Sequence, residues 1–333
     1  MRPDRLRPRH GAFTATIKGV LDRLRPSDRL PLDEDRLDGR AALVTGANRG
    51  LGLAVAAALA HRGARVIAAC RSGVEDVAAR IGGANVEARA LDLASFASVE
   101  KLAGALAEDG VTLDVAILNA GVVAREARAT GDGLDETFQV NFLANVLLVR
   151  RLLERGVLRQ NAAAPPRVVV VSSELHRSAP PIDFTLFGAR RSWGMRRAVA
   201  EYGASKLLLE TWAQELARRA SPGVAVHSMC PGAVNTDVAR EAPSWALPAL
   251  GVVMRAFFQD PAVAARPVVY LASSRAIARE TGVYLHAQRR KERGALAQDP
   301  AAGARLWRES ERLLAEAGHA LQPFGAPAAD GRA

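Results

Sequence analysis

Two residues in the second half of the chain could move a proton. Tyr202 and Lys206 are four positions apart in a segment of helical period, so their side chains lie on one helix face about a turn apart. A free tyrosine has a pKa near ~10, whereas proton exchange with an alcohol or carbonyl at neutral pH works best near ~7. A neighbouring ammonium favours the phenolate. Such a pair also occurs on solvated helix faces, but the chain has only four lysines and one lies in this register.

A second set of residues could bind phosphate groups. The apolar run 41–45 leads through three glycines into a segment of helical period. Glycines permit a tight turn and let a pyrophosphate approach the N–H groups at a helix N-terminus. A glycine triplet alone is weak evidence, but here strand, turn and helix follow in the required order. The predicted phosphate-binding residues are Gly46, Asn48, Arg49, Gly50, Leu51 and Gly52.

These side chains need a scaffold that brings distant segments together. From residue 40 onward, apolar runs of strand length alternate with longer segments of helical period, which is typical of βαβ units around a parallel sheet. The runs are rich in Val, Ile, Leu and Ala, which indicates a sheet covered on both faces. Strands are expected at 41–45, 64–70, 86–92, 113–118, 167–173, 224–229 and, more weakly, 282–286; helices near 50–62, 95–108, 134–155, 203–219, 261–272 and 301–317.

We therefore predict an α/β fold, a doubly wound parallel sheet of the Rossmann type, in a single domain with N- and C-terminal extensions. Residues 1–38 form the N-terminal extension, with apolar residues at the spacing of one short amphipathic helix that packs on the body or contacts a membrane surface. The domain spans 39–290, and 291–333 form a C-terminal helix and tail.

Further residues follow the expected strands in a recognisable order. They are Asp92-Leu93, Asn119-Ala120-Gly121, Asn141 in the next helix, Ser172-Ser173, and Pro231-Gly232-x-Val234-x-Thr236. Together with Thr45-Gly46-x-x-x-Gly50-x-Gly52 and Tyr202-x-x-x-Lys206, this pattern resembles the short-chain dehydrogenase/reductase superfamily over about residues 39–290. It looks most like the retinol dehydrogenase branch, with some similarity to protochlorophyllide reductases.

The resemblance implies an oxidoreductase that acts on CH–OH groups and interconverts an alcohol with an aldehyde or ketone. Tyr202 would be the proton donor in reduction and the base in oxidation, and Lys206 would also hold the nicotinamide ribose. Ser173 would bind the substrate oxygen, with Ser172 as the neighbouring candidate, and Asn141 would order a water chain. The other implied cofactor-binding residues are Asp92, Leu93, Asn119, Ala120, Gly121, Pro231, Gly232, Val234 and Thr236. Phe142-Leu143-Ala144 departs from the His-Leu-Gly common in that branch, which leaves the substrate less certain than the reaction.

The end of the second expected strand indicates which nicotinamide cofactor binds. An acidic side chain there would bind the adenosine ribose hydroxyls and repel a 2′-phosphate, but the chain has Cys70 followed by Arg71. Arg49 adds a second guanidinium in the glycine turn, and arginine suits phosphate recognition. We therefore expect NADP(H) rather than NAD(H), although each arginine could also be an ordinary surface charge.

The segment 245–258 is apolar, is too short to span a bilayer, and follows the expected cofactor-binding loop. We expect it to be a lid over a lipophilic substrate, retinoid-, steroid- or long-chain-like; the alternative is a helix that packs on the body. Two other functions stay open: a non-catalytic NADP(H)-binding regulatory or scaffold protein, and a protochlorophyllide-type reductase.

Composition limits the remaining functional classes. The chain has 333 residues, 49% hydrophobic and 24% charged, with a formal charge of +10. Basic charge alone does not indicate nucleic-acid binding, because no recognition motif accompanies it. Two isolated cysteines predict neither a disulfide framework nor a metal site. We expect a cytoplasmic protein, with peripheral membrane contact through a basic cluster at 190–197 and homo-oligomerisation both open.

Overall fold

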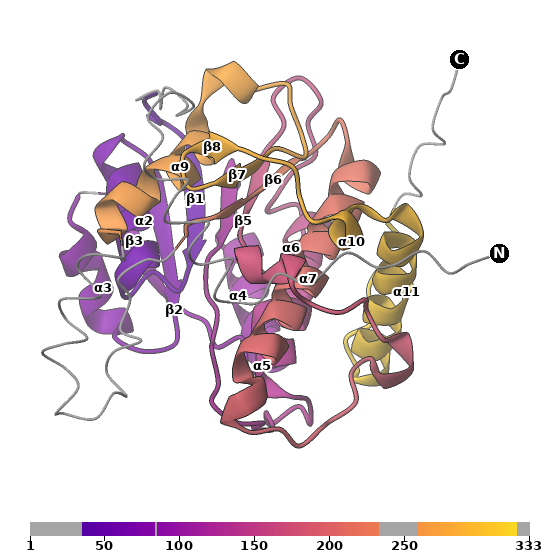
Figure 1. Cartoon of the computed structure of the whole chain (residues 1–333). Helices are drawn as coiled ribbons and strands as arrows, with labels where there is room; N and C mark the ends of the chain where they lie inside the picture. The colour runs from indigo at the N-terminus through magenta and orange to yellow at the C-terminus, as the bar shows by residue number, and fades with distance from the viewer. Residues whose placement is uncertain (1–34, 84, 233–258, 325–333) are drawn as a thin grey trace, which may run out of the picture.

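The fold is a twisted sheet flanked by helices on both faces (Figure 1). The structure is a computed structural model that describes residues 35–83, 85–232 and 259–324. The strands are β1 (Ala41–Thr45), β2 (Arg65–Cys70), β3 (Val86–Ala90), β4 (Val115–Leu118), β5 (Arg167–Val171), β6 (Ala225–Cys230), β7 (Tyr284–His286) and β8 (Arg289–Arg290). They lie in the order β3-β2-β1-β4-β5-β6-β7-β8, parallel except for β8. The predicted doubly wound α/β fold is confirmed.

Each face of the sheet carries its own layer of helices. One face packs against α2 (Gly50–His61), α3 (Val74–Ile81) and α9 (Pro261–Ser273). The other packs against α4 (Phe96–Glu108), α6 (Ala144–Glu154) and α7 (Met195–Ala220). Neighbouring strand residues point to opposite layers, since Leu43 belongs to one core cluster and Val44 to the other. Central strands such as β1, β4 and β5 are therefore buried along their whole length.

Several elements differ from the sequence expectation. Helix α3 and the four-residue α10 (Ala295–Gln298) were not expected, and β8 adds a short antiparallel pairing with β7. Helix α7 begins at Met195 rather than near 203, so two further turns precede Tyr202. A three-residue α5 (Glu136–Phe138) continues into a π-helical turn, η2 (Gln139–Leu143), which contains Asn141.

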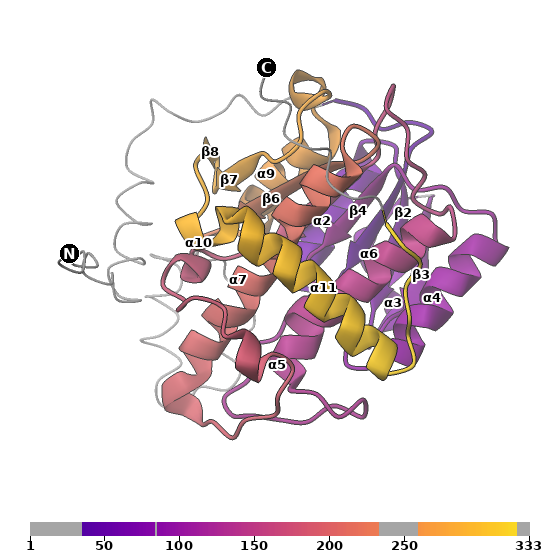
Figure 2. The same ribbon diagram turned by 90° about the vertical axis from the view of Figure 1, so that its right-hand side faces the viewer.

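The C-terminal helix α11 (Pro300–Glu316) packs on the outside of α7 (Figure 2). Trp307 of α11 stacks on Trp212 of α7 with ring centroids 6.2 Å apart and planes 12° apart. The buried guanidinium of Arg150 lies 4.9 Å from the Trp307 ring centroid and also pairs with Glu311. Aromatic stacking and a cation–π contact thus fix this helix on the domain.

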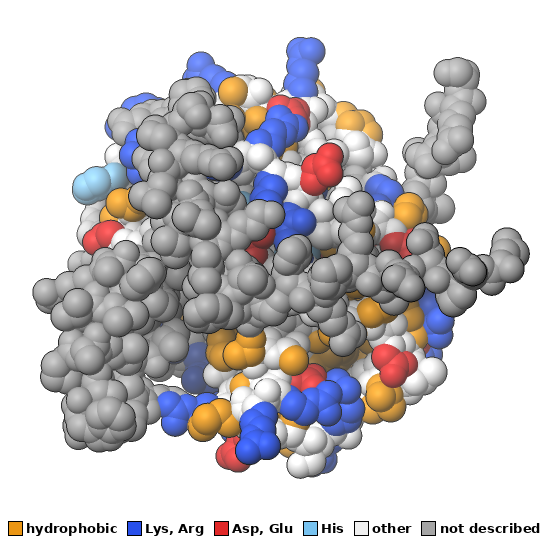
Figure 3. Space-filling model, in the orientation of Figure 1, with side chains coloured by type: hydrophobic (Ala, Val, Ile, Leu, Met, Phe, Trp, Pro, Cys, Tyr) orange, Lys and Arg blue, Asp and Glu red, His pale blue; other side chains and the backbone are white. Residues whose placement is uncertain are grey.

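Basic side chains that are visible on one face of the molecule do not gather in a single patch (Figure 3). On the face shown in Figure 3, blue Lys and Arg side chains are interspersed with acidic and apolar ones. Many arginines are paired; Arg151, for example, lies 2.8 Å from Glu100. Within the described part of the chain, no helix has both the length and the apolar character needed to cross a bilayer.

Candidate active site

The glycine turn between β1 and α2 forms a cradle for a phosphate group. Gly46 and Gly50 have φ angles of +67° and +53°, in the left-handed region that favours glycine. A Cβ on Gly52 would lie 2.2 Å from the carbonyl oxygen of Gly46. Helix α2 follows directly, with no side-chain cap at Arg49 and no acidic residue in its first turn. These N–H groups and the positive end of the helix dipole suit a pyrophosphate, so the residues fit a dinucleotide.

Thr45 links this turn to the end of β4 by hydrogen bonds. Its Oγ1 accepts hydrogen bonds from the N–H groups of Asn119 and Ala120, each 3.0 Å away. In return, the Asn119 side-chain amide donates to the Thr45 carbonyl at 2.9 Å. The segment Asn119-Ala120-Gly121 is therefore held beside the glycine turn. We did not single out Thr45 for this role, although it belongs to the motif that contains Gly46.

Asn141 connects this loop with helix α7. Its Oδ1 accepts from the Val122 N–H at 2.7 Å, and its Nδ2 donates to the Val122 carbonyl at 2.9 Å and to Ser205 Oγ at 3.0 Å. Ser205 Oγ in turn donates to the Tyr202 carbonyl at 2.8 Å. The π-helical turn places this amide, and such turns are frequent at functional sites. Ser205 was not predicted, and its only signal was a polar residue beside Lys206.

Tyr202 and Lys206 lie together at the carboxyl edge of the sheet. Lys206 Nζ is 5.7 Å from the centre of the Tyr202 ring and donates to the Val171 carbonyl at 2.9 Å. A Cβ on Gly121 would lie 3.5 Å from this ammonium and 3.1 Å from Asn141 Oδ1. Tyr202 and Lys206 therefore lie around one point in space, together with Asn141 and the loop after β4.

Burial dominates the acid–base properties of the pair. It lowers the pKa of Lys206 to about 8, against smaller opposing effects of Cys230 and Glu210. It raises the pKa of Tyr202 above its usual value, with Cys230 acting in the same direction and a hydrogen bond with Ser173 acting against both. The protein alone therefore holds Tyr202 as the neutral phenol, the form that can donate a proton.

Ser173 is placed by a polar cluster behind it. It caps the turn η3 (Glu174–Arg177) by accepting from the Leu175 N–H at 3.3 Å. His176 Nδ1 lies 2.6 Å from the Ser173 carbonyl, and its Nε2 accepts from the Gly294 N–H at 3.1 Å, so the neutral ring carries its proton on Nδ1. Burial lowers the pKa of His176, which also favours the neutral ring. We assigned His176 no role; the structure shows it anchoring the serine segment.

Glu174 extends this cluster toward the segment after β8. Burial opposes its ionisation, but hydrogen bonds from Lys291 and Tyr284, each 2.7 Å, prevail and lower its pKa to about 2. Among the described residues, the buried hydroxyl of Ser172, the neighbouring serine, has no hydrogen-bond partner. Ser173 is the serine that interacts with Tyr202, through a side-chain hydrogen bond.

The other predicted cofactor residues that the structure describes lie at strand ends along the same edge. Asp92 and Leu93 follow β3, and Pro231 and Gly232 follow β6. The Asp92 carboxylate caps the Ala94 N–H at 2.9 Å, whereas the Leu93 side chain is buried in the core, which leaves only its backbone at the edge. Val234, Thr236 and the expected lid at 245–258 lie outside the described residues.

The segments that carry Arg49 and Arg71 lie side by side at one corner of this edge. The Asn48 side chain, next to Arg49, donates to the carbonyl of Ser72, next to Arg71, at 3.0 Å. Both arginines are exposed. The turn after β1 and the end of β2 are thus tied together where a dinucleotide's adenosine end would lie.

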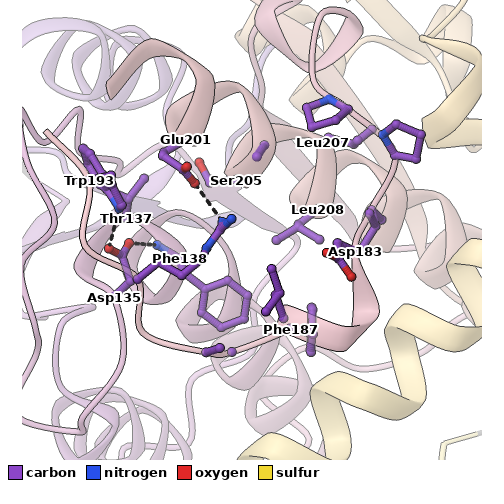
Figure 4. Close-up of a pocket in the computed structure, with 18 residues that line it drawn as sticks. Asp135, Thr137, Phe138, Asp183, Phe187, Trp193, Glu201, Ser205, Leu207 and Leu208 are labelled. Atoms are coloured by element: carbon purple, nitrogen blue, oxygen red, sulfur yellow. Dashed lines mark hydrogen bonds and ion pairs between the residues drawn. The ribbon is translucent and has the colours of Figure 1, made fainter. Parts of the chain in front are cut away.

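A separate cavity lies beside α7 and is lined in part by Glu201, Leu207 and Leu208 of that helix (Figure 4). Its volume is about 140 Å³, and it is walled mainly by apolar side chains, among them Phe138, Phe187 and Leu208. Glu201 at its rim pairs with Arg191 and Arg197 at 3.0 and 2.9 Å. Two of the four arginines that we had considered for membrane contact thus pair with Glu201, whose single negative charge offsets one of their four positive charges. Tyr202 and Lys206 do not line this cavity.

Comparison with known proteins assigns the family. Residues 40–189 match the family model described as short chain dehydrogenase. Retinol dehydrogenase 13 from Homo sapiens is 33% identical over 84% of this chain and 85% of that protein. The chain belongs to the short-chain dehydrogenase family. It is accordingly an oxidoreductase that acts on CH–OH groups, and the predicted likeness to the retinol dehydrogenase branch is confirmed.

Solved structures of family members show the same fold with a bound nucleotide. The Pseudomonas aeruginosa RhlG/NADP active-site complex has a TM-score of 0.60 and 27% identity, over 76% of this chain and 96% of that one. The 3-ketoacyl-(acyl-carrier-protein) reductase from Brucella melitensis, complexed with NADH, has a TM-score of 0.58 and 25% identity, over 75% and 97%. Short-chain dehydrogenases of this fold thus bind either nicotinamide nucleotide.

Proposed function

We propose that this short-chain dehydrogenase is an NADP(H)-dependent enzyme that interconverts a lipophilic alcohol and its aldehyde or ketone. The proposal depends on one observation: Tyr202, Lys206, Ser173 and Asn141 converge at the same sheet edge as the glycine turn. A nicotinamide nucleotide held there supplies or accepts the hydride. The protein's own residues supply the proton and the binding of the substrate oxygen.

Each residue has a distinct task in this proposal. In reduction, the Tyr202 phenol gives its proton to the substrate oxygen, and in oxidation the phenolate removes it. The Ser173 hydroxyl binds the same oxygen as negative charge develops on it. Lys206, as an ammonium, stabilises the phenolate and binds the nicotinamide ribose. Asn141 fixes the backbone of α7 through Ser205, and its proposed further task is to order the water that returns the proton.

Two arginines support the choice of NADP(H). Arg49 and Arg71 lie at the corner that would meet the adenosine ribose, and Cys70 replaces the acidic residue that would repel a 2′-phosphate. Glu75 and Asp76 in the first turn of α3 are the acidic groups nearby in sequence. The two guanidinium groups of Arg49 and Arg71 oppose these negative charges and are suited to bidentate phosphate binding.

Replacing Arg71 by alanine tests this choice. We expect the KM for NADPH to rise by about tenfold or more, since a charge-assisted hydrogen bond contributes roughly 1.5–3 kcal/mol, while the KM for NADH changes little. Arg159→Ala, at an exposed arginine in the loop after α6, serves as the control and should alter neither constant. Unchanged discrimination between the two nucleotides in Arg71→Ala would remove the basis for the preference.

An apolar stripe favours a lipophilic substrate. The two extra turns of α7 place Met195 and Val199 on the helix face of Tyr202 and Lys206, at offsets of 4, 7 and 11 from Met195. Met195 is 68% exposed and Val199 48%, and Val123, in the loop that carries Gly121, is 57% exposed. Apolar side chains that stay exposed on both sides of a reaction centre suit a substrate that covers them.

A series of straight-chain aldehydes tests the function directly. With purified full-length protein and NADPH, we expect kcat/KM to rise by about threefold to fourfold per added methylene until the binding site ends, because each buried methylene contributes roughly 0.8 kcal/mol. Retinal-like and steroid carbonyls should follow the longer aldehydes. Loss of NADPH absorbance gives the rate. Faster turnover of small hydrophilic carbonyls would contradict the lipophilic assignment, and no turnover of any carbonyl would contradict the enzymatic one.

A further inference from the structure

The helix face that carries Tyr202 and Lys206 continues into a buried carboxylate. Glu210 is one turn beyond Lys206 on α7 and is fully buried. Its Oε1 accepts from the Ser228 hydroxyl at 2.6 Å and from Arg293 Nε at 2.5 Å. A buried carboxylate costs several kcal/mol unless it is paired and hydrogen-bonded. Neither the family pattern nor the proposed chemistry gives this group a task.

Arg293 is itself held firmly by the strand ends around it. It donates to the carbonyls of Gly282 and Val283 at 2.5 and 3.2 Å and to Ser228 Oγ at 3.0 Å. With its amide oxygen turned toward the guanidinium, Gln214, a further turn along α7, accepts from Arg293 Nε at 2.8 Å. The pair is therefore a fixed part of the core rather than a mobile contact.

The residue after Arg293 reaches the other side of the reaction centre. The Gly294 N–H donates to His176, whose opposite ring nitrogen bonds the Ser173 carbonyl. Arg293 and Gly294 are consecutive residues after β8. The first binds the carboxylate of Glu210, one turn from Lys206, and the second binds His176, which is bonded to Ser173. The ring of contacts closes through the hydrogen bond between Ser173 and Tyr202.

Among the described residues, Glu210 is the carboxylate that raises the pKa of Lys206. The Lys206 ammonium donates a hydrogen bond to a neutral carbonyl, that of Val171. Other ionisable groups facing this corner are Tyr202 on its own helix, Cys230 at the end of β6, Tyr284 on β7 and His176 in η3. Burial raises the pKa of the thiol to about 11 and also raises those of both phenols, and it lowers that of the imidazole, so all four are neutral near pH 7.

Glu174 is the second carboxylate near this corner among the described residues; it pairs with Lys291 and Arg177 at 2.7 and 3.1 Å, and it is not among the groups that shift the pKa of Lys206. Glu210 lies a single turn from Lys206 and raises the pKa of that amine. Its neighbour Arg293 is a like charge to Lys206, so removing Arg293 while the carboxylate stays ionised is expected to raise the pKa of the lysine.

We propose that Glu210, fixed by Arg293, is a positioning residue that keeps Lys206 in its ammonium form and thereby sets the upper pH limit of the reaction. The proposal rests on the proposed function, because it assigns a task within the same site. Glu210 does not touch the reacting atoms; it acts through Lys206.

The small number of lysines makes the effect directly measurable. The chain has four lysines, so full-length protein labelled with [ε-¹³C]lysine gives four NMR signals, and Lys206→Arg identifies the signal of interest. Without cofactor or substrate, Glu210→Gln is expected to lower the Lys206 titration midpoint by roughly half a pH unit to one unit. Arg293→Gln, which removes the cation and keeps the carboxylate, is expected to raise it.

A matched control lies on the same helix. Glu215 is 1% exposed and pairs with Arg218 and Arg219 at 2.6 and 2.7 Å. Glu215→Gln therefore removes a buried, paired carboxylate from α7 without touching the Lys206 face, and should leave the midpoint unchanged. Turnover gives the second readout: the basic limb of the kcat/KM profile for carbonyl reduction should move to lower pH in Glu210→Gln and stay in place in Glu215→Gln.

An unchanged Lys206 midpoint in Glu210→Gln overturns the proposal, as does an equal shift in Glu215→Gln. If one of the two test variants does not fold, the other decides, because their expected shifts have opposite signs. Absence of carbonyl turnover by the wild-type protein would instead contradict the proposed function, since the lysine titration needs neither cofactor nor substrate.

Discussion

Replacing Tyr202 by phenylalanine is expected to lower kcat/KM for carbonyl reduction by at least about a hundredfold. A positioned general acid typically contributes 10² to 10⁴ in rate, and the phenol is the proposed proton donor, which interacts with Ser173 and lies with its ring centroid 5.7 Å from Lys206 Nζ. The substitution removes one oxygen and keeps the ring, so NADPH binding should change by less than about threefold. Steady-state kinetics and a fluorescence titration of NADPH measure the two quantities separately.

Tyr270 offers the matched control for this substitution. It is a buried tyrosine on α9, the helix that covers the opposite face of the sheet. Tyr270→Phe should leave kcat/KM within about threefold of the wild-type value. Wild-type turnover in Tyr202→Phe would mean that another group supplies the proton. NADPH binding without turnover in the wild-type protein would favour the regulatory or scaffold alternative.

The strands could be predicted from the sequence because both faces of this sheet are covered. A strand such as β5 (Arg167–Val171) is buried along its whole length, so its apolar run has no competing interpretation. Helix α3 has only eight residues between Gly73 and Gly82, which is too short to display a period. The first two turns of α7 contain exposed Met195 and Val199 among arginines, and this composition resembles that of a loop.

The residues of the candidate site could be predicted from the sequence where a local motif contains them, and the contacts between distant segments could not. Residues tied to a local motif, such as Gly46 or Tyr202, could be predicted because the chemistry fixes their spacing along the chain. The contacts that hold them could not: Asn141 and Ser205 are 64 positions apart, Arg293 and Glu210 are 83, and Gly294 and His176 are 118. Only the folded sheet brings these partners together, and a single sequence contains no record of the pairing.

Adding one methyl group at Gly52 is expected to disable nucleotide binding. The new Cβ would lie 2.2 Å from the Gly46 carbonyl oxygen and 2.5 Å from Asn119 Nδ2, closer than real Cβ atoms approach. One of these contacts is backbone, so the turn itself must move rather than a flexible side chain. Asn119 is also the residue that joins the turn to the loop after β4. Both the phosphate cradle and its attachment to the reaction centre are therefore displaced.

For Gly52→Ala we expect the Kd for NADPH to rise by at least about tenfold and kcat/KM to fall by at least about a hundredfold, since misplacement by about 1 Å costs that much in rate. Overpacking should also lower the free energy of unfolding by about 1–3 kcal/mol. Gly104→Ala in α4 is the control, because its nearest contact is the movable guanidinium of Arg155 at 3.1 Å and alanine favours a helix. If Gly52→Ala loses stability but binds NADPH normally, the turn is a packing feature and the nucleotide binds elsewhere.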